Sequence, residues 1–210
     1  MSDFVTLLGA RRLIPIATIE DAADAVPLAK ALLGGGIDIL EITLRTAQAL
    51  RCIENVSKHV PQMLVGAGTI LTTNALANAR DAGAQFFVSP ALSIDIINQA
   101  REHSLALMPG VFTPTEVLSA HESGCRLLKL FPADLAGGTV MLKHLASVYP
   151  QMRFCPTGGI GEAHIKQYLS LPNVAAIGGS WLAPASMIAA KNWDEIQMVA
   201  KKGAEQAAAM

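Results

Sequence analysis

Eight short apolar runs recur along the 210-residue chain, and this repeat limits the possible folds more than any other feature. The starts of the runs lie 20 to 27 residues apart. Each run carries Gly, Pro, Thr or Ser at or near its end, as is typical where a strand stops. The runs are IPIATI from Ile14, IDILEIT from Ile37, MLVGAGT from Met63, QFFVSP from Gln85, LALMPGV from Leu105, RLLKLFP from Arg126, RFCPTGG from Arg153 and VAAIGGS from Val174.

The segments between the runs are rich in Ala, Leu and Gln, which is typical of helices. Strands that alternate with helices pair in parallel, and eight such units can close into a barrel. Since about 200 residues is the lower limit for this architecture, we predict one α/β domain over residues 1–210, a (β/α)8 TIM barrel with short loops. An open, doubly wound sheet is the alternative. Against it, TIEDAADA follows IPIA where a G-x-G-x-x-G turn would be needed.

Several helical segments carry their own start signals. Residues 113–116, Thr-Pro-Thr-Glu, combine a capping box with a proline at the first helical position. Apolar residues at a spacing of three and four predict amphipathic helices over 47–60 and 93–103. Pro27 conflicts with the first long helix and predicts a kink or a late start there. The opening stretch, MSDFVTLLGARR, starts acidic and turns basic, the reverse of a signal peptide, and we expect a short N-terminal amphipathic helix instead.

The composition restricts the partners of the protein. Hydrophobic residues make up 51% of the chain and charged residues 16%, with a formal net charge of −1 and no basic stripe. This argues against nucleic acid and against anionic membrane surfaces as partners. No apolar stretch reaches the length of a membrane span, so we expect a soluble protein. Three widely spaced cysteines, Cys52, Cys125 and Cys155, suggest neither a disulfide framework nor a zinc site and favour a cytoplasmic location.

Lys129 stands in the middle of the apolar run RLLKLFP, where an unpaired ammonium group would be costly to bury. Alternate residues of a barrel strand face the interior. Since Leu128 and Leu130 should pack on the outer helices, Lys129 should point inward. The same alternation in LEITLR turns Glu41 inward and Arg45 inward or toward the mouth. An acid and an amine from two strands should therefore meet, and their place at the carboxyl ends favours a functional pair over a structural one.

Paired glycines follow the seventh and eighth runs, in TGGI (157–160) and GGSW (178–181). They leave backbone N–H groups uncovered, and a helix starting near Gly161 would add the positive end of its dipole. Phosphate commonly binds at this place in barrels, and the hydroxyl of Ser180 would add a donor. Neither loop contains a lysine or arginine. A phosphate pocket is the functional interpretation, and a pair of tight turns is the structural one.

Three further residues follow strand ends. Arg45 offers a planar fork suited to a carboxylate, unless it is a solvated surface arginine. Thr69 in GAGT and Pro90 in VSP end the third and fourth runs, where they would line the mouth. The histidines all fall in helical segments or at their ends without ligand spacing, so we predict no catalytic metal. They are His59, His103, His121, His144 and His164.

Six motifs occur in order from the second strand to the eighth and cover most of the chain. They are LEITLRT (40–46), VGAGT (65–69), SPALS (89–93), KLFPA (129–133), FCPTGGI (154–160) and IGGSW (177–181). As a set, they resemble the 2-keto-3-deoxy-6-phosphogluconate (KDPG) aldolase family, which includes 4-hydroxy-2-oxoglutarate (KHG) aldolases. The arginine of LRT and the tryptophan of GGSW resemble the gluconate type more than the galactonate type. Val111-Phe112 departs from the family pattern, in which smaller or more polar residues are usual.

The resemblance implies a class I aldolase on a (β/α)8 barrel, a homotrimer without a metal or organic cofactor. It implies that a 2-keto acid is cleaved: KDPG, in the Entner-Doudoroff pathway, to pyruvate and glyceraldehyde 3-phosphate, and KHG to pyruvate and glyoxylate. Lys129 would form the Schiff base, Glu41 would be the general acid/base, and Arg45 would hold the substrate carboxylate. The remaining implied residues are Thr69, Pro90, Phe131 and Thr157 around the pyruvyl part, and Gly158, Gly159, Gly178, Gly179 and Ser180 around the phosphate.

Two other functions fit the same residues. A barrel isomerase or epimerase acting on a sugar phosphate would share the glycine loops, but Lys129 would be an electrostatic helper. A catalytically silent sugar-acid-binding barrel would tolerate Glu41→Gln, whereas an aldolase would lose most of its turnover. Only the aldolase would gain a covalent adduct on Lys129 after treatment with borohydride and pyruvate.

Overall fold

The strands of the protein pair only in parallel within the part that the computed structural model describes, residues 4–210. One curled sheet has six strands in the order β5-β4-β3-β2-β1-β9, and a second has three in the order β6-β7-β8. The strands are β1 (Leu13–Ala17), β2 (Ile39–Thr43), β3 (Leu64–Gly68), β4 (Phe86–Val88), β5 (Leu107–Met108), β6 (Gly110–Val111), β7 (Leu127–Leu130), β8 (Arg153–Pro156) and β9 (Ile177–Gly179). The predicted α/β class and the parallel pairing are therefore confirmed.

The two sheets approach each other at both of their edges. At one edge, β5 and β6 are separated by Pro109 alone. A single strand was expected there, but proline has no N–H to donate to a ladder, so the run is divided into two short strands. At the other edge, isolated parallel bridges join Phe154 to Val174 and Thr157 to Gly178.

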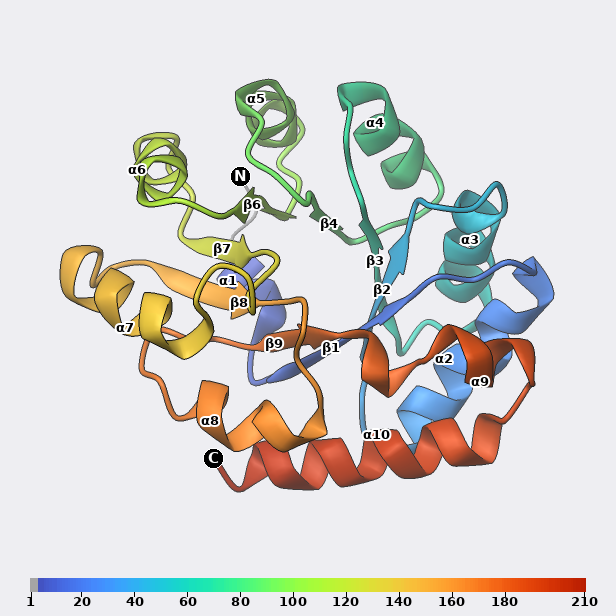
Figure 1. The fold of residues 1–210 in the computed structure, drawn as a ribbon. Coiled ribbons are helices and arrows are strands. Elements are labelled where there is room, and N and C mark those ends of the chain that lie inside the picture. Colours follow the sequence, from blue (N-terminus) through green and yellow to red (C-terminus); the bar gives the residue numbers. More distant parts are fainter. Residues whose placement is uncertain (1–3) are drawn as a thin grey trace.

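Helices surround the strands on all sides in the view of Figure 1. The helices cover the outer face of the strands, and the inner face is buried as well, which explains why the strands are almost continuously apolar. All five residues of β2 and of β3 are buried. The helices are α1 (Phe4–Leu8), α2 (Ala25–Gly34), α3 (Ala49–His59), α4 (Thr73–Asp81), α5 (Ile94–Glu102), α6 (Pro114–Glu122), α7 (Gly138–Val148), α8 (Ile165–Leu169), α9 (Ala185–Ala189) and α10 (Trp193–Ala208), with 3-10 turns η1 (Ala22–Asp24), η2 (Glu162–His164) and η3 (Ser180–Leu182).

The local start signals act as the sequence predicts. Thr113 caps α6, and Glu116 completes the capping box. Helices α3 and α5 lie within the predicted ranges 47–60 and 93–103. Helix α2 starts late, after η1, so that Pro27 is its third residue. The first four N–H groups of a helix have no intrahelical acceptor, and proline is therefore tolerated there.

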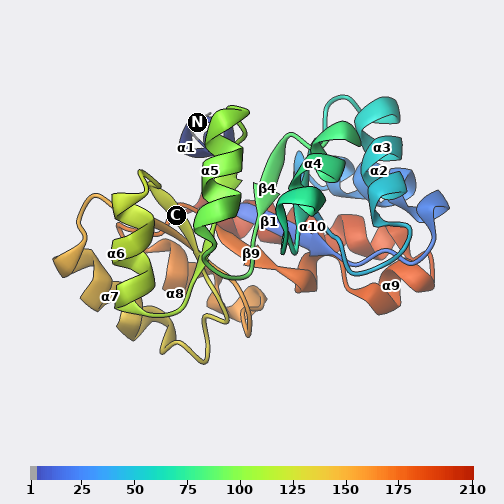
Figure 2. The same ribbon diagram turned by 90° about the horizontal axis from the view of Figure 1, so that it is seen from above.

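Helix α1 covers Phe4–Leu8 of the predicted N-terminal helix and ends before residues 9–12, and residues 1–3 of that prediction lie outside the described range. The ring of Phe4 packs edge-on against Phe86, the first residue of β4, with the ring centroids 5.3 Å apart. Helix α1 therefore lies near the amino ends of the strands, away from the viewer in Figure 1 and in sight in Figure 2. Over residues 4–210, no helix has the length and apolar character required to cross a bilayer.

Candidate active site

The side chains of Lys129 and Glu41 meet between β7 and β2. Nζ of Lys129 lies 3.3 Å from Oε1 of Glu41 and donates a hydrogen bond to it. Lys129 is 6% exposed and Glu41 is 1% exposed. The alternation argument predicted that both would point inward, and the geometry agrees. An amine and a carboxylate are therefore held in contact in a place nearly closed to bulk water.

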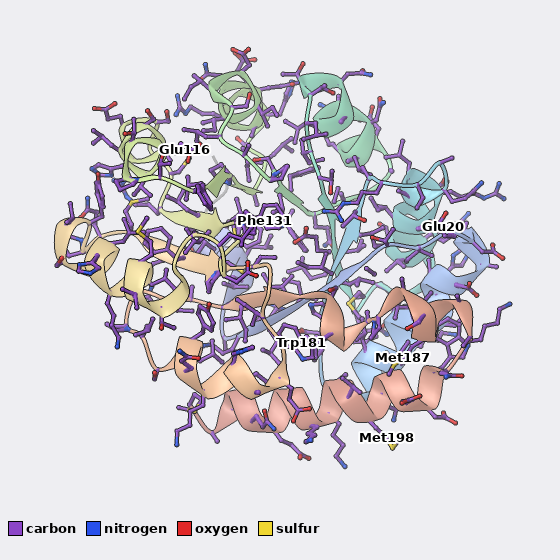
Figure 3. All side chains as sticks on the ribbon, viewed as in Figure 1. Glu20, Glu116, Phe131, Trp181, Met187 and Met198 are labelled. Atoms are coloured by element: carbon purple, nitrogen blue, oxygen red, sulfur yellow. The ribbon has the colours of Figure 1, made fainter. Side chains whose placement is uncertain are left out.

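Such a buried ion pair contributes little to the stability of a fold. Desolvation of two charges offsets most of their attraction, and replacement by apolar residues is often neutral or stabilising. The ring of Phe131 also lies beside the amine, with its centroid 5.2 Å from Nζ of Lys129. Figure 3 shows Phe131 toward the middle of the ring of helices, whereas Glu20 and Met198 lie at its outer edge. An amine with a carboxylate at hydrogen-bond distance can act as a nucleophile assisted by a general base.

Cys155 is the register partner of Lys129 on β8 and is fully buried. Burial raises the pKa of this thiol to about 12, with a lowering effect from Lys129 and a raising effect from Glu41. A thiol with so high a pKa stays protonated, and the thiolate is the reactive form. The thiol of Cys155 is therefore an unreactive neighbour of Lys129.

Gly68 makes room for the carboxylate, and sequence reasoning did not single it out. A Cβ at Gly68 would overlap Oε1, Cδ and Cγ of Glu41. The register pairs Thr43 of β2 with Gly68 of β3, so the close approach follows from the sheet itself. The available signal was a glycine inside a strand, which often marks a close approach.

Arg45 and Thr69 contact each other at the carboxyl ends of β2 and β3. Nε of Arg45 donates to Oγ1 of Thr69 at 3.2 Å. Thr69 has φ of +62°, a left-handed conformation that is uncommon for a non-glycine residue. Such residues concentrate at functional sites. A pair of hydroxyl groups, Thr18 with Thr43 at 2.9 Å, lies at the ends of β1 and β2 and was missed because threonine is common in strands.

The two glycine loops lie side by side, because Thr157 forms a bridge with Gly178. Gly158 and Gly159 have φ of +98° and +68°, and a Cβ on Gly159 would overlap the carboxylate of Asp134. In the described chain, the N–H groups of these two glycines donate no hydrogen bond. The expected helix at Gly161 begins as the 3-10 turn η2 and becomes α-helical only at Ile165.

The other predicted residues occupy the same end of the strands. Thr157 is buried beside Cys155, Gly179 packs under the ring of Trp181, and Ser180 is exposed at the start of η3. Pro90 and Phe131 line a cavity of about 380 Å³ together with Val111, Phe112 and Pro132. Among residues 4–210, no three His, Cys, Asp or Glu side chains are grouped as metal ligands would be.

The family model of KDPG and KHG aldolase matches residues 6–199. The 2-dehydro-3-deoxy-phosphogluconate aldolase of Pseudoalteromonas atlantica is 42% identical over 195 residues, covering 93% of this chain and 91% of the relative. The KHG/KDPG aldolase of Escherichia coli is 41% identical over 202 residues, covering 96% and 95%.

Solved structures agree with these sequence relatives. The KDPG aldolase of Legionella pneumophila, with pyruvate captured as a covalent carbinolamine, has a TM-score of 0.92 and 39% identity, covering 95% of this chain and 97% of that one. The enzyme of Zymomonas mobilis with 3-phosphoglycerate has a TM-score of 0.89 and 41% identity, covering 97% and 95%. Fold and relatives thus define a class I aldolase, an α/β lyase. The chain belongs to the KDPG and KHG aldolase family.

Proposed function

We propose that the protein cleaves KDPG to pyruvate and glyceraldehyde 3-phosphate, and KHG to pyruvate and glyoxylate, through a Schiff base on Lys129. The observation that carries this proposal is the buried contact of 3.3 Å between Lys129 and Glu41. Relatives named for each substrate, at about 40% identity over nearly the whole chain, support the choice of reaction.

The first half of the reaction uses the amine. Neutral Lys129 attacks the C2 carbonyl of the substrate, and the carbinolamine loses water to give an iminium ion. The Legionella pneumophila enzyme holds pyruvate as a carbinolamine, which supports the same step here. The iminium accepts the electron pair of the C3–C4 bond when that bond breaks, so the barrier to cleavage falls.

The second half uses the carboxylate. Glu41 takes the proton of the C4 hydroxyl, directly or through one water, while the C3–C4 bond breaks and the aldehyde leaves. The enamine that remains on Lys129 is protonated at C3 by the same carboxyl group. Hydrolysis of the iminium then releases pyruvate and restores the amine. The space left by Gly68 lets Glu41 approach Lys129 for both proton transfers.

The substrate is held by groups around this pair. Arg45 binds the carboxylate of the substrate, and its hydrogen bond to Thr69 orients the guanidinium. Thr69, Pro90, Phe131 and Thr157 surround the pyruvyl part. The phosphate is held by the Gly158–Gly159 and Gly178–Gly179 loops with the Ser180 hydroxyl. Two successive N–H groups free to donate, at Gly158 and Gly159, support an anion-binding nest.

The architecture that we propose for this function is one closed (β/α)8 barrel over residues 1–210. Counting β5 and β6 as one interrupted strand gives eight strand positions. Closure is supported by the short step across Pro109 and by the bridge between Thr157 and Gly178.

The assembly that we propose is a homotrimer in the cytoplasm. Large apolar side chains exposed near the carboxyl ends of the strands support an assembly, including Leu135 at 74% and Phe112 at 41%. A cage designed by fusing symmetric oligomeric domains has a TM-score of 0.83 and 26% identity, with 71% of that chain covered. All three cysteines are free, which suits a reducing compartment.

Substitution of the amine tests the function. Lys129→Arg and Lys129→Met should fold and should lose carbon–carbon cleavage of both substrates, because neither side chain forms an iminium. The release of pyruvate measures cleavage. In the unaltered enzyme, the value of kcat/KM for KDPG compared with that for KHG measures the preference between the two substrates. Cleavage that survives in either variant would refute the proposed chemistry.

A further inference from the structure

Two adjoining cavities lie at the amino ends of the strands, away from Lys129. One has a volume of about 400 Å³ and the other about 460 Å³. Both are lined by Ala10, Arg12, Ala207 and Ala208. The first also reaches Leu13 and Ile39, which begin β1 and β2, and the second reaches Arg153, which begins β8. Because the strands are parallel, these cavities open at the opposite end of the fold from the aldolase site.

The walls of both cavities are mainly apolar. Leu13, Ile37 and Ile39 line the first cavity, and Val5 and Leu8 of α1 line the second. The last turns of α10 supply small side chains along both. Apolar walls of this kind favour a hydrocarbon group, since transfer of apolar surface out of water is favourable.

Three arginines, Arg11, Arg12 and Arg153, bring guanidinium groups to these cavities, and they differ in their hydrogen-bond partners. Arg11 is neutralised, because its Nε and Nη2 donate to the carboxylate of Asp38 at 2.8 Å and 2.6 Å. Arg12 donates from Nη2 to the carbonyl of Leu169 at 3.0 Å. Its Nε is buried and has no hydrogen-bond partner within residues 4–210. The side chain of Arg12 lines both cavities and has one carbonyl partner but no carboxylate partner within residues 4–210.

Arg153 adds a second positive charge. Within the described residues, its guanidinium makes no hydrogen bond or ion pair. Asp38 is the one acidic side chain among the lining residues of the two cavities, and Arg11 already pairs with it. The carbonyl end of α10 opposes an anion, but it carries only a partial charge. Arg12 and Arg153 therefore present two guanidinium groups that no acidic side chain among the lining residues neutralises.

We propose that the joined cavities bind a small amphipathic organic anion, a carboxylate with an apolar tail. The carboxylate would lie against Arg12 and Arg153, since a guanidinium group matches the two oxygens of a carboxylate. The tail would lie along the alanines of α10 and the apolar residues that begin β1 and β2. This site is independent of the aldolase reaction proposed above, because none of its lining residues belongs to the catalytic end.

Calorimetric titration of the full-length protein with octanoate tests the proposal, and acetate and 1-octanol serve as matched probes. Octanoate should bind at one site per chain, and acetate and 1-octanol should each bind at least about tenfold more weakly, because each lacks one half of the recognition. Arg12→Gln and Arg153→Gln should each weaken octanoate binding by about tenfold. Arg153→Gln is the safer variant, since the guanidinium of Arg153 bonds to no residue among 4–210.

A tryptophan scan locates the site. Ala208 is exposed and lines both cavities, so Ala208→Trp should fill them and abolish octanoate binding. Ala209 is exposed and lines neither, so Ala209→Trp should bind octanoate as the unaltered protein does. Both variants should cleave KDPG at the normal rate. Absence of octanoate binding, equal binding of 1-octanol, or unchanged binding in Ala208→Trp would each overturn the proposal.

Discussion

Lys129 and Glu41 face each other in surroundings where an ion pair contributes little to folding. Both side chains are almost completely removed from water, and each loses hydration that the other replaces only in part. The contact is therefore better explained by chemistry than by stability. Proton transfer requires the acid and the base within hydrogen-bond reach of the reacting groups, and 3.3 Å between Nζ and Oε1 places one group beside the other.

Substitution of one member of the pair should lower the free energy of unfolding, because the other charge stays buried. Lys129→Met leaves the carboxylate of Glu41 buried without its cation, and the free energy of unfolding should fall by about 3–5 kcal/mol. The double variant Lys129→Met/Glu41→Leu also removes the unpaired carboxylate, so most of the lost free energy of unfolding should be recovered. Urea unfolding at pH 7 measures both. A double variant as unstable as the single one would show that the pair itself stabilises the fold.

Gly68 offers a test that leaves both charged residues in place. In Gly68→Ala, the new methyl group overlaps the Glu41 carboxylate and displaces it from Lys129, so kcat should fall by about 100-fold or more. Steady-state cleavage of KDPG measures this change. Ala67→Gly is the matched control, since it also alters one methyl group on β3 but on the opposite face. Equal losses of kcat in the two variants would contradict the role given to Gly68.

The inward direction of Lys129 and Glu41 was predictable because side chains alternate along a strand. The space at Gly68 and the hydroxyl pair of Thr18 and Thr43 were not predictable. Both depend on which residues of neighbouring strands stand side by side, and the register of β1, β2 and β3 is a property of the assembled sheet. The direction of a side chain can thus be predicted from its own strand, whereas its neighbours on adjacent strands depend on the register of the sheet.

At the scale of single elements, α6 shows a start fixed by a few polar groups. Oε2 of Glu116 accepts hydrogen bonds from the N–H groups of Phe112 and Thr113 and from the hydroxyl of Thr113. Burial acts to raise the pKa of Glu116, but these three hydrogen bonds outweigh it and hold the pKa below its ordinary value of 4.5. The ionised carboxylate is therefore the form that stabilises the helix start.

Glu116→Ala should lower the free energy of unfolding by about 1 kcal/mol at pH 7. Because the folded pKa lies below the unfolded one, this contribution is complete above 4.5 and is lost as the pH falls through the folded pKa. The difference between the variant and the unaltered protein should therefore shrink between pH 7 and pH 4, as measured by urea unfolding. Glu122→Ala, at the exposed end of α6, is the control. A difference that grows toward pH 4 would contradict this account.

Element boundaries were predictable where a side chain bonds to the local backbone. The TPTE signal located the start of α6, and Pro27 indicated the late start of α2. The division at Pro109 and the 3-10 start after Gly161 were not predicted. Apolar periodicity finds where an element lies, but the ends of short strands and helices depend on neighbours that are distant in the sequence.

At the scale of the whole molecule, apolar surface remains uncovered near the catalytic end. Leu135 is 74% exposed and lines the cavity shared with Phe131. Leu135→Glu should weaken the proposed trimer, because it places a charge on this apolar surface. Sedimentation velocity should show smaller species than for the unaltered protein. Met198 on α10 is 65% exposed at the outer edge, and Met198→Glu should leave the mass unchanged. If the Leu135→Glu variant still forms a trimer, the contact between protomers does not lie at Leu135.

The proposed reaction requires one buried amine to become covalently bonded to the substrate. Borohydride reduction in the presence of pyruvate, followed by peptide mass spectrometry, tests this most directly. We expect one reduced pyruvyl group per chain, located on Lys129, and none when pyruvate or borohydride is omitted. An unmodified Lys129 in an enzyme that still cleaves KDPG would contradict it.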